Sequence, residues 1–421
     1  MNTRKNLSAI RGSSVACVIV ALSSQALAFQ HHGPQSRPDQ PLAWDVHFPA
    51  GVSMVEIPFR EVMGMIFVDV KINGSEPQSL VIESGWSAPS LLLTEDAESF
   101  DFEYADYARP KEGGHGDFQM GRLAQNVKIE FGDLRIEGVE FEVASRAENE
   151  FLGMLPEDGV LGVKLLEKLV VEIDWEQGHV RLHDPSTFKA PDDAVPVPLT
   201  FKHGLSYANG EVTIDGKSQR IKFIVDTGSA GTLLVRSDKT GVPERRISDV
   251  TLGQSLHGLV KGDIGRIDRL TIGGANLKNM VSRFLDKSSG MIAVGSDGNL
   301  GNGVLRRFTV TFDYSRSRML LKPNDAIDDP FPFSTSGMAL DREIDDDGSI
   351  GIRRIYDDAP AARAGLKVGD RIVAMNSQPV ADLGIDAIRE LLRQSPGTRV
   401  RLQIRQADSV REVELELDIV L

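Results

Sequence analysis

The sequence predicts a mainly β protein in which two related lobes precede a small α+β domain. One acidic loop occurs twice, apolar residues alternate around both copies, and the last part of the chain has its own pattern of strands and a helix. With 421 residues, the chain is long enough for two or three domains. Its 41% hydrophobic content is ordinary for a globular protein.

Residues 1–28 have the features of a secretory signal peptide. Basic residues precede an apolar core at 15–22, and the small-residue run ALA at 26–28 suits a cleavage site. The core is much shorter than the roughly 20 residues of a spanning helix, so cleavage is favoured over an uncleaved anchor. We therefore expect an exported protein, periplasmic or secreted, that starts at Phe29 with a leader over 29–50 and has no membrane span.

Composition excludes several classes of chemistry. The single cysteine, Cys17, lies within the signal, so we expect no disulfide and no thiolate nucleophile in the mature chain. The eight histidines show no HExxH or similar ligand spacing, and we expect no metal and no other cofactor. The 61 acidic against 47 basic residues give a net charge of −14, which argues against a nucleic-acid partner.

The acidic loop is the strongest internal similarity. Residues 223–230 are FIVDTGSA, and residues 80–87 are LVIESGWS. Each follows a hairpin-like sequence that leads into a buried strand. Two carboxylates on two related loops, Asp226 and Glu83, suggest one shared catalytic site.

A second pair of similar segments follows the acidic loops. The sequence DGVLG at 158–162 corresponds to DGNLG at 297–301, and each leads through a short helical stretch to a strand that ends near Asp174 or Asp313. The spacing is the same in both copies, so neither contains an insertion. Both repeats therefore have the same order of elements.

Domain boundaries are expected where the apolar pattern stops. Pro and Asp residues interrupt it over 185–198, which predicts lobe 1 over 51–190 and lobe 2 over 191–325. A second linker over about 322–336 leads into the small C-terminal domain, predicted over 336–421.

The context of the second acidic loop resembles that of retropepsin-like aspartic proteases. A DTG tripeptide alone is common in turns, but here it follows an apolar strand, precedes LLV at 233–235 and is paired with NLG at 299–301. The resemblance covers roughly 51–325, with VLG at 160–162 as the closer match to the second family segment. It implies a mainly β fold of two retropepsin-like β-barrel lobes, with Asp226 catalytic.

The resemblance also implies a mechanism. Two facing carboxylates hold one water; one accepts its proton during attack on a peptide carbonyl, while the other, protonated, supports the carbonyl oxygen. Close like charges make such a pair share one proton. Glu83 would be the partner of Asp226, and the hydroxyl after each acid would tie the loops together. The supporting residues implied in this way are Thr227, Gly228, Ser84 and Gly85.

Lobe 1 departs from the family pattern at two positions. Glu83 stands where the family has Asp, and Trp86 where it has a small residue. The additional methylene matters, because misplacing a reacting group by about 1 Å can cost about a hundredfold in rate. Three interpretations stay open: an Asp226 and Glu83 dyad, a lobe 1 that has become a scaffold, and a dimer that pairs the Asp226 lobes of two chains.

The flap of this family is a β-hairpin that closes over the substrate. Two glycine-containing segments, 113–116 and 252–258, are candidates, although both also suit ordinary surface turns. The predicted function is an exported aspartic endopeptidase acting on a peptide or protein substrate. The alternative is a non-catalytic peptide-binding scaffold, and Glu83 is the feature that discriminates between them.

The C-terminal segment 359–372, APAARAGLKVGDRI, resembles bacterial PDZ domains. Such domains bind a peptide as an added strand, and backbone N–H groups hold its terminal carboxylate. The resemblance implies a C-terminal peptide ligand; an empty groove in a domain that only packs against the lobes is the alternative. The residues expected in the carboxylate-binding loop are Ser336, Gly337, Met338 and Ala339.

Overall fold

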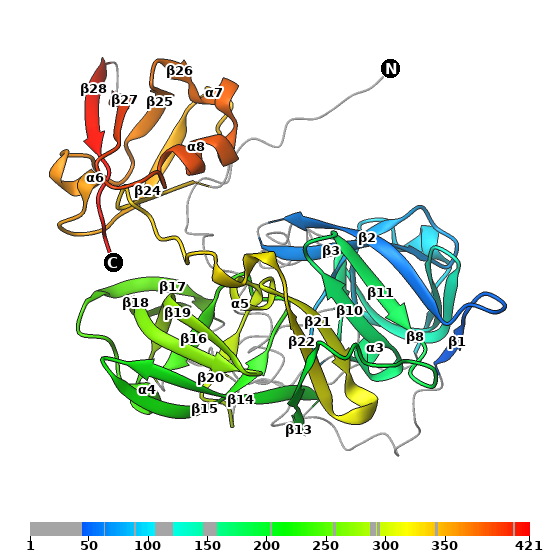
Figure 1. Cartoon of the computed structure of the whole chain (residues 1–421). Coiled ribbons are helices and arrows are strands. Elements are labelled where there is room, and N and C mark those ends of the chain that lie inside the picture. The colour runs from blue at the N-terminus through cyan, green and yellow to red at the C-terminus, as the bar shows by residue number, and fades with distance from the viewer. Residues whose placement is uncertain are drawn as a thin grey trace, which may run out of the picture.

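The protein consists of two β lobes and a smaller α+β domain (Figure 1), and the predicted fold class is confirmed. The computed structural model describes residues 44–62, 64–87, 90–105, 121–145, 158–202, 204–255, 258–286, 292, 295–341, 344–406 and 409–421. The predicted signal and the candidate flap segment 113–116 lie outside these residues. No helix in the described part of the chain is long and apolar enough to cross a membrane.

The described residues of lobe 1 form eleven strands and two short helices: β1 (Asp45–His47), β2 (Met54–Val62), β3 (Met65–Ile72), β4 (Gln78–Ile82), β5 (Ser90–Leu93), η2 (Ala97–Phe100), β6 (Glu103–Tyr104), β7 (Arg122–Phe131), β8 (Leu134–Ala144), β9 (Gly159–Leu161), α3 (Val163–Lys168), β10 (Val170–Asp174) and β11 (His179–His183). In β3 the buried Val68, Val70 and Ile72 alternate with exposed residues, as a strand with one face on a core requires. β1 pairs with β8, so lobe 1 begins before its predicted boundary at residue 51.

Lobe 2 repeats this order of elements: β13 (Thr200–Lys202), β14 (Leu205–Ile214), β15 (Lys217–Val225), β16 (Leu233–Arg236), α4 (Ser237–Thr240), β17 (Arg246–Ser255), β18 (Gly258–Ile272), β19 (Ala275–Leu285), β20 (Gly298–Leu300) and α5 (Asn302–Leu305). Asp215 (φ 47°) and Gly216 (φ 72°) form the turn between β14 and β15. Positive φ at both positions suits a tight hairpin turn, which favours the Asp-Gly pair. Asn73 (φ 48°) and Gly74 (φ 81°) do the same after β3.

A six-stranded segment of sheet joins the lobes, in the order β12 (Val195–Pro198), β22 (Arg318–Pro323), β21 (Phe308–Asp313), β10, β11 and β2. The junction is the antiparallel pair of β10 and β21, where Val171 lies opposite Phe312 and Ile173 opposite Val310. All four side chains are fully buried, and burying one such side chain contributes about 1.5–3 kcal/mol. The predicted linker 185–198 therefore contributes a strand, β12, to this sheet.

The buried Asp313, at the end of β21, is expected to make the stability of this junction sensitive to acid. Its carboxylate is buried, and it accepts hydrogen bonds from Ser315 Oγ (2.7 Å), Arg318 Nε (2.8 Å) and Arg316 Nη1 (3.1 Å). Burial alone would raise the pKa of Asp313, but these hydrogen bonds outweigh it and hold the pKa below the ordinary value of 3.8. A lowered folded-state pKa gives stability that is present above the ordinary value and is lost as pH falls through the lowered one.

We therefore expect the melting temperature to fall steeply below about pH 4, and Asp313→Asn to flatten this dependence while lowering stability at neutral pH. Differential scanning calorimetry between pH 7 and pH 2.5 measures both effects. Asp133→Asn, on an exposed turn, is the matched control. An unchanged pH dependence in Asp313→Asn would contradict the prediction.

The C-terminal domain, as far as the structure describes it, has six strands and three short helices: β23 (Met338–Leu340), β24 (Ile350–Ile355), α6 (Pro360–Arg363), β25 (Arg371–Met375), β26 (Gln378–Pro379), α7 (Val380–Leu383), α8 (Ile385–Leu391), β27 (Arg399–Gln406) and β28 (Ser409–Glu416). Its core is separate from that of the lobes and includes Ile350, Ile372, Leu402 and Ile388 of α8. The chain reaches this domain through η4 (Tyr314–Arg316), β22, η5 (Asp325–Asp328) and the segment after them.

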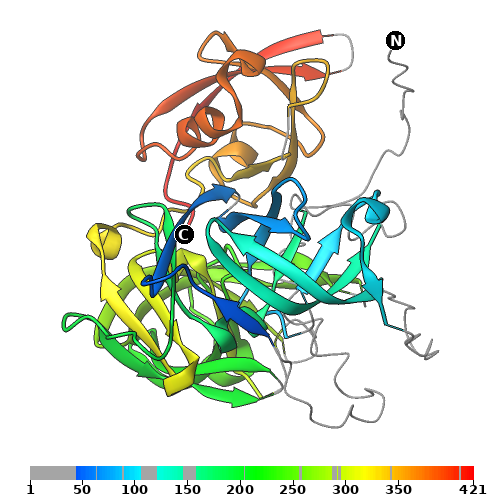
Figure 2. The ribbon, with the colours of Figure 1, turned by 90° about the vertical axis from the view of Figure 1, so that its right-hand side faces the viewer.

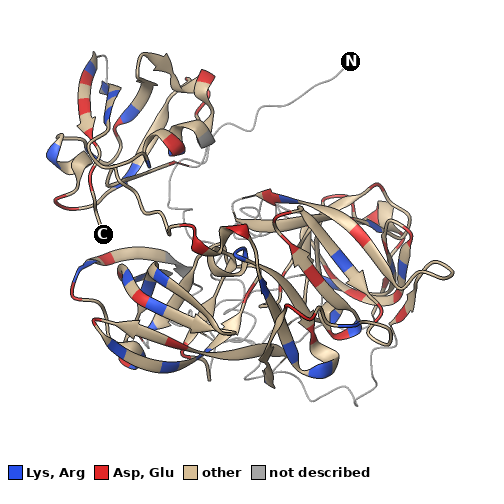
Figure 3. Ribbon diagram, in the orientation of Figure 1, with Lys and Arg blue, Asp and Glu red and all other residues tan. Residues whose placement is uncertain are grey.

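The C-terminal domain contacts lobe 2 at the hairpin of β17 and β18, near which the C-terminus lies in Figure 1. In the view of Figure 2 this domain lies above the two lobes. Arg354 Nη2 donates to Thr251 O (2.8 Å), and Arg266 Nε donates to Leu421 O (3.2 Å). The side chain of Leu421 packs with Leu252 of the hairpin in one apolar cluster. Basic and acidic residues are interspersed on both lobes and on this domain (Figure 3).

Candidate active site

The two acidic loops are held in the same way by their own lobes. Glu83 follows β4, and its N–H donates to Leu161 O (2.9 Å); Asp226 follows β15, and its N–H donates to Leu300 O (2.9 Å). In both lobes the acceptor lies on a neighbouring parallel strand, β9 or β20. Each acid therefore leaves a buried strand at an equivalent position.

Reciprocal hydrogen bonds lock one loop to the other. The Ser84 N–H donates to Thr227 Oγ1 (2.9 Å), and the Thr227 N–H donates to Ser84 Oγ (3.0 Å). Each hydroxyl also donates across the lobes: Thr227 Oγ1 to Ile82 O (2.6 Å) and Ser84 Oγ to Val225 O (2.8 Å). Ser84 and Thr227 are fully buried, so bulk water does not compete for these bonds. This is the tie that the resemblance implied for these two residues.

Both acids are buried beside this tie. Asp226 is 0% and Glu83 1% exposed. A methyl group placed on Gly228 would lie 2.3 Å from Glu83 Cδ, so the carboxyl group of Glu83 occupies the space that a side chain at Gly228 would need. A side chain at Gly228 would therefore displace the carboxyl group of Glu83, and the structure brings Glu83 to the loop of Asp226.

Each oxygen of Asp226 accepts a hydrogen bond. The Gly228 N–H donates to Oδ1 (2.9 Å), and Asn299 Nδ2 donates to Oδ2 (2.6 Å). Donors directed at both oxygens favour the ionised form of a carboxylic acid. Asn299 comes from β20, within the segment NLG that the sequence analysis used only as a pattern match.

Asn302 is a second residue that the sequence analysis missed. Its Nδ2 donates to Thr227 O (2.7 Å) in its own lobe and to Gly64 O (2.9 Å) in lobe 1. The sequence feature that could have pointed to both residues is the pair of Asn at 299 and 302, which stand on either side of Leu300 and Gly301. Apolar residues occupy the equivalent positions of lobe 1, Val160 and Val163.

Trp86 does not disrupt the loop of lobe 1. It is 2% exposed, and its carbonyl oxygen accepts a hydrogen bond from Val163 N (2.9 Å). At the equivalent position of lobe 2, Ser229 O accepts from Asn302 N (2.7 Å). The large side chain is therefore accommodated within lobe 1, and the backbone bond to the following helix is the same in both lobes.

Family comparisons agree with this arrangement. The aspartyl protease family model matches residues 68–165 and 210–305, so each match contains one acidic loop and its partner glycine segment. A PDZ domain model matches residues 351–406. The chain joins two aspartyl protease lobes to a PDZ domain.

Among solved structures, the chain is similar to the aspartic proteinase from Irpex lacteus, with 15% sequence identity and a TM-score of 0.42. The alignment covers 65% of this chain and 98% of that one. Comparison with curated proteins gives no significant match.

Of the candidate flap segment 252–258 in the second protease lobe, residues 252–255 end β17 and residue 258 begins β18, while 256 and 257 lie outside the described residues. Leu252 is 2% exposed and belongs to the apolar cluster that includes Leu421. Its neighbour Thr251 accepts the hydrogen bond from Arg354 of the PDZ domain. The hairpin is therefore in direct contact with the PDZ domain.

The predicted carboxylate-binding loop lies in the PDZ domain, separate from the two acids. Ser336, Gly337 and Met338 are buried, and Met338 and Ala339 are the first two residues of β23, the edge strand of the sheet. The Gly337 N–H donates to Ser334 Oγ (3.0 Å) and the Met338 N–H to Ser336 Oγ (3.4 Å). In this structure, two of the backbone N–H groups that were expected to bind a carboxylate therefore donate to serine hydroxyls instead.

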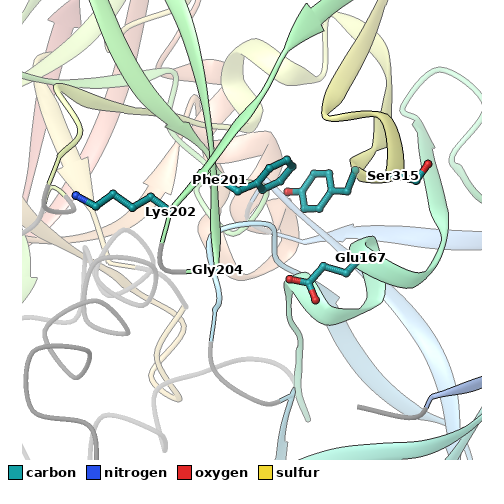
Figure 4. Close-up of a pocket in the computed structure, with 6 residues that line it drawn as sticks. Glu167, Phe201, Lys202, Gly204 and Ser315 are labelled. Atoms are coloured by element: carbon teal, nitrogen blue, oxygen red, sulfur yellow. The ribbon is translucent and has the colours of Figure 1, made fainter. Parts of the chain in front are cut away.

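A pocket of about 330 Å³ lies between the protease lobes (Figure 4). Its lining includes Glu167 of α3 and Phe201 and Lys202 of β13, and Lys202 extends away from the Phe201 ring. Phe201 stacks edge to face on Tyr314, with ring centroids 4.8 Å apart. Neither acid lines this pocket. Within the described residues, no cluster of three or more His, Cys, Asp or Glu side chains could hold a metal ion.

Proposed function

We propose that this protein is an aspartic endopeptidase in which Asp226 and Glu83 activate one water between them. The observation that carries the proposal is the reciprocal bonding of Ser84 and Thr227, which fixes the two acidic loops together in a buried position. A carboxylate and a carboxylic acid at such a site suit general base and general acid roles in peptide hydrolysis.

Gly228 supports Glu83 as the second acid. The longer side chain needs additional room, and the absence of a Cβ at Gly228 provides it where Glu83 Cδ lies. The carboxyl group of Glu83 lies against the loop of Asp226, as the second acid of a dyad requires. The dyad is therefore favoured over a decayed lobe 1.

The experiment is an incubation of the chain with a mixed peptide library between pH 3 and pH 7, with new termini identified by mass spectrometry. An aspartic endopeptidase gives internal cleavage that a chelator does not affect. Peptide binding without new termini at any pH would instead support the alternative of a non-catalytic scaffold. A rate that rises with the square of protein concentration, together with full activity of Glu83→Gln, would support pairing of two Asp226 lobes.

Substitutions of Glu83 separate these interpretations further. We expect Glu83→Gln to lower kcat/KM by about a hundredfold or more, since general acid–base catalysis contributes roughly that much. Glu83→Asp keeps a carboxyl group and should retain or raise activity. The matched control is Glu142→Gln, because Glu142 is a similarly buried glutamate of the same lobe (2% exposed). Equal activity of wild type and Glu83→Gln would remove Glu83 from the mechanism.

We also propose that the PDZ domain binds a peptide by strand addition at β23. Among the described strands, β23 pairs with β24 alone, so its second edge is available for an added strand. An incoming terminal carboxylate would replace the hydroxyls of Ser334 and Ser336 as acceptor for the N–H groups of the loop. The partner is a peptide or protein substrate, or a separate peptide ligand.

Export is part of the proposal as well. Its support is the order of basic, apolar and small residues over 1–28.

A further inference from the structure

We propose that Asn299 decides which of the two acids carries the shared proton, so that Asp226 is the general base and Glu83 the general acid. This inference rests on the proposed function and adds to it a positioning residue and an assignment of roles. The sequence of the two loops alone does not make this assignment, because each carries an acid followed by a hydroxyl residue and a glycine.

The first observation is the environment of Asp226. Asn299 Nδ2 lies 2.6 Å from Oδ2, and the Gly228 N–H lies 2.9 Å from Oδ1. An amide NH₂ group donates and does not accept, so a proton on Oδ2 would face another donor. Both contacts therefore favour the negative charge on Asp226, in a buried site where a charge-assisted hydrogen bond is strong.

The second observation is that the two lobes differ at the position of Asn299. In lobe 2, Asn299 lies opposite Ile224 in the pairing of β15 with β20; in lobe 1, Val160 lies opposite Val81 in the pairing of β4 with β9. Val160 is fully buried and has no polar side-chain atom. This position therefore supplies a side-chain donor to the acid in lobe 2, which favours the charged carboxylate there, and supplies no side-chain donor in lobe 1.

The position of Glu83 acts in the same direction. Its carboxyl group lies against Gly228 in the loop of Asp226, where a methyl group would be 2.3 Å from Glu83 Cδ. A charge on Glu83 would therefore oppose a charge on Asp226. One proton, held on Glu83, relieves this repulsion.

The roles follow for the reaction itself. Ionised Asp226 takes one proton from the water as the water oxygen bonds to the peptide carbonyl carbon, and Glu83 gives its proton to the carbonyl oxygen. When the C–N bond breaks, Asp226 returns its proton to the leaving nitrogen, while Glu83 recovers a proton from one hydroxyl of the tetrahedral intermediate. Both acids end in their starting states.

The test compares Asn299→Val, which copies lobe 1, with Asn299→Gln, which keeps an amide donor. Loss of a hydrogen bond to a charged group should make Asp226 take up a proton at higher pH, and we expect about a tenfold loss of kcat/KM on the acidic side of the pH profile. The rate at the optimum should change much less, and Asn299→Gln should restore part of the acidic side. An unchanged profile, or one displaced toward lower pH, would overturn the inference.

A second measurement keeps the inference separate from the proposed function. Carboxyl ¹³C NMR of Asp- and Glu-labelled protein follows the proton without any substrate, and the Asp226 signal is the one that is absent from Asp226→Asn. We expect this signal to titrate at higher pH in Asn299→Val than in wild type. A displaced titration without peptide cleavage would reject the endopeptidase but keep the role of Asn299; cleavage without any displacement would reject the role of Asn299 alone.

Discussion

Asp226→Asn is expected to abolish peptide cleavage, with kcat/KM reduced by about a thousandfold or more, as for removal of one member of a catalytic unit. The amide is nearly the same size as the carboxylate but cannot accept a proton from the water. Its oxygen still accepts the hydrogen bond from Gly228, while its NH₂ group takes the place of Oδ2, so the Asn299 amide has to turn and present its oxygen. Cleavage products measured by mass spectrometry and initial rates give the effect directly.

The control for Asp226→Asn is Asp297→Asn. The carboxylate of Asp297 accepts a hydrogen bond from Lys222 N (3.1 Å) in the same lobe, outside the acidic loop. An Asn at 297 can also accept this bond, so the variant should keep its activity and its melting temperature. Cleavage by Asp226→Asn at the rate of wild type would reject Asp226 as a catalytic residue and would assign the activity to another site or a contaminant.

Thr227→Val is expected to have the largest effect on stability. The substitution keeps the shape of the side chain but removes Oγ1, which accepts from Ser84 N and donates to Ile82 O. Two buried backbone groups then lose their partners, at about 1–3 kcal/mol each. We expect the free energy of unfolding to fall by about 2–5 kcal/mol, measured by denaturant titration, with a loss of activity because the loops are no longer held together.

Thr227→Ser is the matched control, because it keeps the hydroxyl and should retain most of the stability. Ser84→Ala removes the reciprocal partner, so Ser84→Ala and Thr227→Val should be clearly non-additive when combined. Additive effects in this double-mutant cycle, or a stable Thr227→Val, would show that the bonds between the loops do not hold the site together.

Local sequence was sufficient for much of the fold. The Asp-Gly and Asn-Gly pairs at 215–216 and 73–74 indicated hairpins, because these residues adopt the positive φ that such turns require. Alternating apolar residues indicated strands, and the repeated acidic loop indicated two related lobes. These signals depend on neighbours in the chain, which a sequence displays directly.

The sequence alone determined the two acids, the hydroxyl after each of them and the presence of a PDZ domain. Only the tertiary structure decided that Ser84 and Thr227 bond across 143 residues, that β10 pairs with β21 to join the lobes, and that Asn299 donates to Asp226. Pairing with distant strands also decided that part of the predicted leader forms β1 and that part of the predicted linker forms β12. The physical reason is that these contacts depend on which buried groups face each other after the chain has folded, and a residue's own neighbours in sequence do not specify its partner across the lobes.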